Sequence, residues 1–90
     1  MSTLIDKFFR FKPKEEYKRL GGIQKIYQFD NGYGASVIRH EHSYGFEQGL
    51  WELGVLIGSE LTYDTEITND VIGHLTEEEV QKYLMEISEL

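Results

Sequence analysis

The sequence predicts an α+β fold: a three- to four-stranded antiparallel meander, with an N-terminal helical segment and a C-terminal helix packed on the sheet. Three apolar runs separated by turn residues lie between residues 23 and 58, and a helix-capping pattern precedes apolar residues at helical spacing near the C-terminus. Ninety residues make a single domain that can bury about 60 to 65% of the surface its unfolded chain exposes. We expect a basic helical segment over residues 1–22, the sheet over 23–67 and a C-terminal helical segment over 68–90.

The strongest turn signal is Asn31-Gly32, because a two-residue type I′ turn requires positive φ at both of its central residues. Counting outward from such a turn pairs Lys25 with Ile38. A one-residue bulge is the alternative, and it would place Lys25 opposite Arg39. Because like charges facing each other across a strand pair are unfavourable, we predict the pairing without a bulge.

The third apolar run, residues 50–57, alternates so that one side is continuously apolar and is expected in the core. That side consists of Trp51, Leu53, Val55 and Ile57. Residues 60–67 also alternate and predict a fourth, edge strand, whose charged side chains discourage pairing with other chains. Residues 68–73 predict one helical turn that begins at a capping threonine and ends at a glycine.

The N-terminal segment predicts a short helix over residues 2–11, which Pro13 ends because the residue before proline avoids helical geometry. A second helical stretch is predicted from Glu15 to Leu20, terminated by Gly21-Gly22. Aromatic and basic residues alternate over residues 8–12, so a membrane-binding amphipathic segment is an alternative. The segment is barely long enough to bind a membrane, so we expect it to pack on the sheet instead.

The final segment predicts a helix from local signals alone. Thr76 and Glu79 form a capping box, and Leu75 and Val80 occupy the hydrophobic staple positions. The residues that follow make one apolar stripe at helical spacing, expected to cover one face of the sheet. The stripe consists of Val80, Tyr83, Leu84 and Ile87.

Charge divides the chain into two unequal parts. Residues 1–25 hold seven bases and three acids, a net of +4, and residues 26–90 hold two bases and thirteen acids, a net of −11, which gives the total of −7. Such asymmetry bears on partners more than on fold. It indicates either an acidic surface that binds a cationic partner or a basic segment that lies on the acidic body of its own chain or of a second copy.

No sequence motif for catalysis, metal or cofactor binding withstands inspection, and we predict no enzyme activity. The absence of cysteine excludes disulfides and thiolate zinc sites. A calcium loop beginning at Asp64 fails because Asn69 and Leu75 stand where glycine and glutamate are needed. The glycines of Gly32-Tyr33-Gly34 precede no helix, so no phosphate loop is present.

Three histidines and a set of aromatic residues leave weaker alternatives. His40, His42 and His74 allow a three-histidine metal site, but their spacing does not require one. Exposed aromatic rings on a small sheet suit RNA stacking, yet the acids around them would repel a polyanion, so direct nucleic-acid binding is disfavoured. No apolar run approaches the ~20 residues of a membrane span, and no signal peptide is evident, so a cytoplasmic location is expected.

The segments DNGYGASVIRH, SYG, GLWELGVL and YDTEITNDVIGHLTEEEV resemble small uncharacterised accessory proteins of tailed bacteriophages. The resemblance covers about residues 22–90 and carries no catalytic residue. It implies an accessory protein that acts in the cytoplasm of an infected bacterium. Such a protein would bind and inhibit or redirect a host or defence complex, including restriction and CRISPR systems, through an acidic surface.

The expected partner has a basic surface, and the predicted contact residues are carboxylates and two loop aromatics. They are Asp64, Glu66, Asp70, Glu77, Glu78, Glu86 and Glu89, with Tyr44 and Phe46. One alternative is a phage structural or accessory component that self-associates through its basic N-terminal segment. Another is a small-ligand-binding protein that uses the region of His40, His42 and Tyr44.

Overall fold

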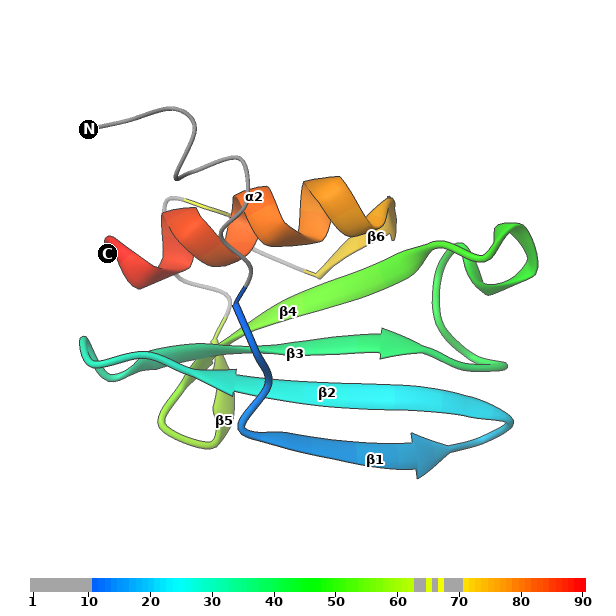
Figure 1. Ribbon diagram of the computed structural model, residues 1–90, viewed down its shortest axis with the longest axis horizontal. Helices are drawn as coiled ribbons and strands as arrows, with labels where there is room; N and C mark the ends of the chain where they lie inside the picture. The colour runs from blue at the N-terminus through cyan, green and yellow to red at the C-terminus, as the bar shows by residue number, and fades with distance from the viewer. Residues whose placement is uncertain (1–10, 63–64, 66, 68–70) are drawn as a thin grey trace.

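The protein is described here by a computed structural model, in which residues 11–62, 65, 67 and 71–90 are described. Within them, six antiparallel strands form one sheet, and helix α2 lies across one of its faces (Figure 1). The elements in chain order are β1 (Glu15–Arg19), β2 (Gly22–Gln28), β3 (Tyr33–Arg39), the 3₁₀ turn η1 (Phe46–Gln48), β4 (Trp51–Ile57), β5 (Glu60–Thr62), β6 (Ile72–Leu75) and α2 (Glu77–Ser88).

Strand β4 is the centre of the sheet because it pairs along both of its edges. The strand order is β1-β2-β3-β4-β5, and β6 also pairs with β4. One edge of β4 faces β3, while the other is shared by β5 at the Val55 end and by β6 at the Trp51 end. The predicted three- to four-stranded meander is therefore wrong, since the described residues form six strands.

The predicted N-terminal helical segment is also wrong where the structure describes it. The stretch from Glu15 to Arg19 is strand β1, and residues 1–10 of the prediction lie outside the described residues. Leu20 and Gly21 have φ of 43° and 77°, which is the type I′ geometry of a two-residue hairpin turn. This turn brings β1 back along β2, so that Arg19 pairs with Gly22 and hydrogen bonding to β2 replaces the helix.

The turn between β2 and β3 has three residues, not the predicted two. Phe29 N donates to Tyr33 O at 2.8 Å, and Gly32, with φ of 87°, follows a type I turn. The predicted register is consequently wrong by one residue, because Lys25 pairs with Val37. A shift of one residue moves every β2 side chain to the other face of the sheet relative to β3.

The Asn31 side chain forms hydrogen bonds with two backbone segments at this turn. Its Oδ1 accepts a hydrogen bond from Tyr33 N at 2.9 Å, and its Nδ2 donates to the carbonyl oxygens of Ile87 at 2.9 Å and Leu90 at 3.3 Å. The last carbonyl groups of a helix have no partners within the helix. Asn31 therefore caps the C-terminal end of α2 and ties it to the β2–β3 hairpin.

Replacing Asn31 by aspartate is expected to lower the free energy of unfolding by about 2 kcal/mol. The carboxylate cannot donate to Ile87 or Leu90, and it adds negative charge at the negative end of the helix dipole. Urea unfolding at neutral pH measures the loss. Asn31→Gly, which removes the donor without adding charge, should lose less stability, and equal losses would show that the added charge is unimportant.

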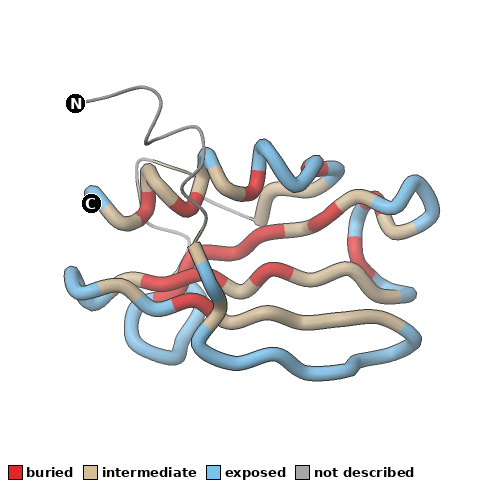
Figure 2. The backbone as a smooth tube through the Cα atoms, in the orientation of Figure 1, coloured by how far each residue is buried: buried red, intermediate tan, exposed pale blue. Residues whose placement is uncertain are grey.

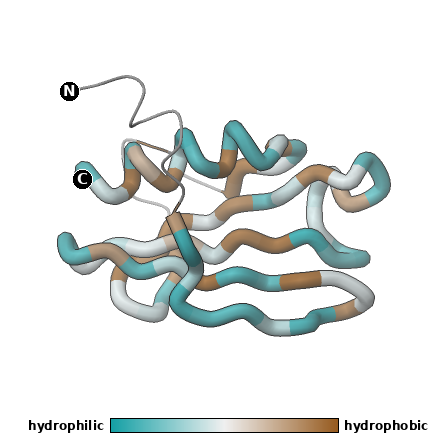
Figure 3. Tube along the Cα trace, in the orientation of Figure 1, coloured by the Kyte–Doolittle hydropathy of each residue, from teal (hydrophilic) through white to brown (hydrophobic). Residues whose placement is uncertain are grey.

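The core lies between α2 and the covered face of β2, β3 and β4. Trp51, Leu53 and Val55 are buried there, which confirms the predicted core side of the third run, whereas Ile57 is 51% exposed, contrary to the prediction. Figure 2 shows burial concentrated on β4 and on the inner side of α2, and Figure 3 shows hydrophobic residues in the same places. Strand β1, at the far edge, is exposed along its whole length.

Helix α2 begins as predicted. The Thr76 hydroxyl accepts from Glu79 N at 3.2 Å, and Glu79 Oε1 accepts from Thr76 N at 2.9 Å, which completes the capping box. The apolar stripe is confirmed as a packing surface because three of its residues are buried against the sheet. They are Val80, Leu84 and Ile87.

The segment before α2 differs from the prediction. Strand β6 occupies residues 72–75, so the helical turn predicted over residues 68–73 is wrong for Ile72 and Gly73, while residues 68–70 lie outside the described residues. Of the predicted fourth strand, β5 contains residues 60–62. Gly73 lies so close to Tyr44 that a Cβ there would be 2.5 Å from the Tyr44 Cβ, which explains a glycine within this strand.

Candidate functional site

The solvent side of α2 carries a band of carboxylates, which we call the acidic helix face. It consists of Glu78, Glu79, Glu86 and Glu89. The buried residues of α2 face the sheet, so residues at this spacing project to the opposite side of the helix. Lys82 lies among them and is the one basic residue of the helix sequence. The face is therefore acidic along most of its length.

Glu79 of this face is hydrogen-bonded within the helix. Hydrogen bonds from the Thr76 backbone N–H and hydroxyl hold the pKa of Glu79 below its ordinary value. A carboxylate in the first turn also interacts favourably with the positive end of the helix dipole. Glu79 thus stays ionised to lower pH than an unbonded carboxyl, and it contributes charge to the face as well as structure to the helix.

The other predicted acidic contacts are placed unevenly. Glu78, Glu86 and Glu89 belong to the acidic helix face, whereas Glu77 lines a cavity between α2 and the sheet. Asp64, Glu66 and Asp70 lie outside the described residues. The structure thus gathers three of the seven predicted carboxylates on one side of the helix.

The two predicted loop aromatics contact different parts of the molecule. Tyr44 is 62% exposed, packs beside Gly73 of β6, and donates its backbone N–H to Glu52 Oε1 at 2.9 Å. Phe46 is half-buried and lines a surface hollow of about 630 Å³ near the β1–β2 turn, together with Ile23 and Arg39. Tyr44 is the more accessible of the two rings.

His40 and His42 lie in one compact turn, and His74 belongs to β6. His42 N donates to His40 Nδ1 at 3.1 Å, and the ring centroids of these residues are 6.3 Å apart. Ser43 Oγ donates to the His40 carbonyl and accepts from His40 N, both at 2.9 Å, so this serine is part of the turn. Across the described residues, no three histidine or carboxylate side chains are grouped to hold a metal ion.

A cluster that sequence analysis missed surrounds Trp51. Arg39 Cζ lies 4.4 Å and Lys25 Nζ 4.9 Å from the centroid of the indole ring, distances typical of cation–π contacts. Arg39 Nη1 also donates to Gly49 O at 3.3 Å. The correct β2–β3 register would have predicted the cluster, since it places Lys25 on the same face as Trp51.

Comparison of the chain with protein-family models, with curated proteins and with solved structures finds no match. Separately, no helix within the described residues is long and apolar enough to cross a membrane.

Proposed function

We propose that the protein is a non-enzymatic, phage-type accessory protein that binds a host or defence complex and inhibits or redirects it. The acidic helix face supports this proposal, because it carries four carboxylates and a single lysine on the side of α2 that faces away from the sheet. Such a face complements a basic, nucleic-acid-binding surface on a partner. Opposite charges also steer encounter between the two surfaces and discriminate against other partners.

The position of the face within the fold supports the same proposal. Helix α2 is held by its capping box at one end, by Asn31 at the other, and by buried Val80, Leu84 and Ile87 between them. The carboxylates therefore project from a rigid support. A preorganised surface loses less conformational freedom on binding than a mobile loop does.

Charge reversal on the acidic helix face is expected to abolish or strongly weaken partner binding. The variant Glu78→Lys/Glu86→Lys/Glu89→Lys should bind the partner at least about tenfold more weakly at physiological salt, because attraction becomes repulsion. The partner is obtained by capture of the tagged protein from its bacterial host, with and without nuclease, followed by mass spectrometry. Binding of the purified partner then measures the effect.

The matched control carries the same charge change elsewhere. Glu41, Glu47 and Glu60 are exposed and lie outside α2, so their replacement by lysine changes net charge equally. This control should retain binding, and thermal unfolding of both variants tests their folding. Equal loss in both variants would show a nonspecific charge effect, and capture without enrichment of any host protein would contradict the proposal.

Self-association is the second candidate, because bases gather on the opposite side of the chain from α2. Lys14, Lys18 and Arg19 lie on or beside the exposed edge strand β1, and against Glu15 and Glu16 of the same strand they leave this edge a net charge of +1. The β1 edge of one copy can therefore attract the acidic helix face of another. The molecular mass measured by size-exclusion chromatography at low and at high salt distinguishes self-association from binding of an external partner. A dimer at low salt that dissociates at high salt favours self-association, and a monomer at both salts favours an external partner.

A further inference from the structure

A cavity of about 280 Å³ lies between the sheet and the first half of α2, beneath the chain segment that enters β1. In Figure 1 this segment passes from the helix layer to the edge of the sheet and crosses in front of β2 and β3. At ~30 Å³ per water molecule, the volume corresponds to roughly nine waters, or a ligand of about ten heavy atoms. It is separate from the acidic helix face, the loop aromatics and the histidines.

Apolar side chains from three parts of the chain form the wall of this cavity. They are Phe11, Pro13, Val37 and Val80. The entering segment is fixed in place, because Phe11 N donates to Gln81 Oε1 at 2.9 Å and the Phe11 ring packs edge-on against Phe29 with centroids 5.2 Å apart. These four side chains can contact the hydrocarbon part of a small ligand, whereas polar atoms make up most of the exposed lining.

Two buried residues in the same cavity have polar atoms without partners. Tyr27 and Trp51 are each 3% exposed, and within the described part of the chain neither the hydroxyl nor the indole N–H takes part in a hydrogen bond. Neither atom is fully enclosed either, since no fully buried side-chain nitrogen or oxygen there lacks a partner. Both residues line the cavity. Both donors therefore remain available to an acceptor that enters the cavity.

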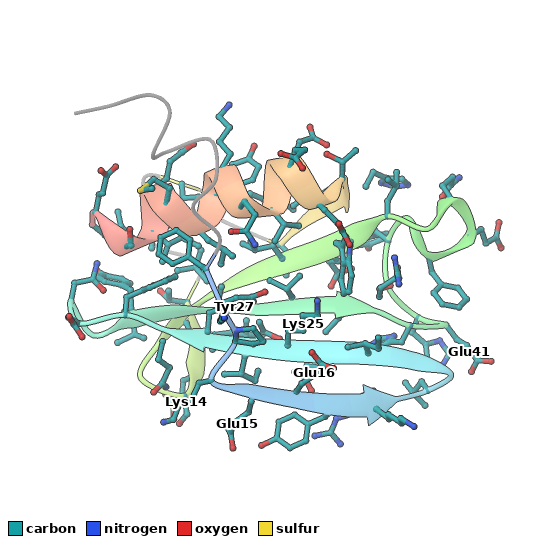
Figure 4. The ribbon with its side chains drawn as sticks, in the orientation of Figure 1. Lys14, Glu15, Glu16, Lys25, Tyr27 and Glu41 are labelled. Atoms are coloured by element: carbon teal, nitrogen blue, oxygen red, sulfur yellow. The ribbon has the colours of Figure 1, made fainter. Side chains whose placement is uncertain are left out.

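A third donor, the Lys25 ammonium, lines the same cavity. Figure 4 shows Lys25 and Tyr27 side by side on β2, beneath α2, with Glu16 close to Lys25. Burial, followed by the nearby carboxylates of Glu16 and Glu77, raises the pKa of Tyr27. The hydroxyl therefore remains protonated at neutral pH and can donate a hydrogen bond.

The charges at the cavity limit what it can accept. Lys25 supplies one positive charge, and Glu16 beside it and Glu77 on the first turn of α2 each supply one negative charge. This balance disfavours a phosphate or another dianion. The donors of Tyr27, Trp51 and Lys25 can bind an acceptor group of low charge, and a single carboxylate, which Lys25 attracts, is such a group.

We propose that this cavity binds a small monocarboxylate with an aromatic or branched hydrocarbon group. The hydrocarbon packs against the apolar wall, and the carboxylate accepts hydrogen bonds from Tyr27, Trp51 and Lys25. Glu77 at the rim weakens this binding through repulsion. The site is thus a small-molecule site that operates independently of any protein partner on the acidic helix face.

Phenylacetate is the probe that tests the site, because it has a phenyl group, a single carboxylate and the required size. Trp51 is the one tryptophan of the chain, so its fluorescence reports occupancy directly. We expect a saturable fluorescence change at about millimolar concentration, as is usual for so small a ligand, with amide chemical-shift changes confined to the cavity lining. Phenethylamine and benzyl alcohol should bind at least about tenfold more weakly. No saturable change in either measurement, or equal binding of phenethylamine, would overturn the proposal.

Paired variants test the donors one at a time. Tyr27→Phe and Lys25→Met should each weaken phenylacetate binding about tenfold, the usual effect of losing a hydrogen bond to a charged group. Tyr17→Phe and Lys14→Met make the same chemical changes outside the cavity and should leave binding unchanged. Glu77→Gln should strengthen binding a few-fold by removing the repulsion. Since Lys25 contacts the fluorophore, affinities come from chemical shifts, and equal effects in cavity and control variants would contradict the site.

Discussion

Replacing Leu84 by alanine is expected to lower the free energy of unfolding by about 2 to 5 kcal/mol. Leu84 is fully buried where α2 packs on the sheet, so the substitution removes apolar contact and leaves a cavity. Alanine favours the helix, and the loss therefore reports packing alone. Small domains have a total stability of about 5 to 15 kcal/mol, so this single change removes a large part of it. Urea unfolding followed by Trp51 fluorescence measures the effect.

Leu90→Ala is the matched control because it deletes the same atoms near the end of the same helix. Leu90 is 39% exposed, and its backbone carbonyl keeps the hydrogen bond from Asn31. We expect a loss of about 1 kcal/mol or less. Similar losses for Leu84→Ala and Leu90→Ala would contradict the packing of α2 described above.

Replacing Gly34 by alanine is expected to cost about 3 kcal/mol, although alanine is a small residue. Gly34 is buried in β3, and a Cβ there would overlap the backbone carbonyl oxygen of Tyr27 on β2. A backbone carbonyl cannot move aside without separating the two strands, so the overlap becomes strain in the sheet. Thermal and urea unfolding should both show the loss.

Gly54→Ala provides the comparison on the adjacent strand. Gly54 is also buried, but a Cβ there would meet Leu61 Cδ2 at 2.7 Å, the end of a flexible side chain that is 49% exposed. This side chain can turn away into solvent, and we expect a change within about 1 kcal/mol. If Gly34→Ala were tolerated as well as Gly54→Ala, the close approach of β2 and β3 at this point would be wrong.

The parts of the fold that the sequence predicts correctly depend on local signals. The capping box of α2 is complete within four residues, and the alternation of β4 identifies Trp51, Leu53 and Val55 as core without reference to other strands. Both patterns reflect the geometry of a single element. Sequence analysis therefore succeeds where the residues of a single element are enough to show which of its side chains are buried.

The register of the β2–β3 hairpin was predicted wrongly because Asn31-Gly32 suits two different turns. It reads as a two-residue type I′ turn, but residues 30–32 form a three-residue turn in which Gly32 alone has positive φ. The Asn31 amide also bonds Ile87 O, 56 residues later, a contact that the sequence does not indicate. Strand β1 was missed for a different reason. Its sequence EEYKR has no apolar side, and it is a strand because the Leu20-Gly21 turn returns it to β2.

The wrong β2–β3 register also prevented prediction of the residues that line the cavity. With Lys25 opposite Ile38, the side chains of Lys25 and Tyr27 would lie on the face of the sheet opposite Trp51. In the structure Lys25 pairs with Val37, and Lys25, Tyr27 and Trp51 line one cavity. The acidic helix face, by contrast, follows from helical periodicity alone, so Glu78, Glu86 and Glu89 could be assigned to one side of a helix from sequence.

The consecutive pairing of β1 through β5 also determines how the chain acquires its shape. Each of these strands pairs with its neighbour in sequence, so the hairpins form from short-range encounters that cost little chain entropy and proceed rapidly. β6 and α2 are synthesised after the other strands, and β6 must then return to β4 from about twenty residues away. The apolar surface of the sheet is thus complete before its cover is synthesised, and a nascent chain arrested before Thr76 exposes that surface to chaperones and to aggregation.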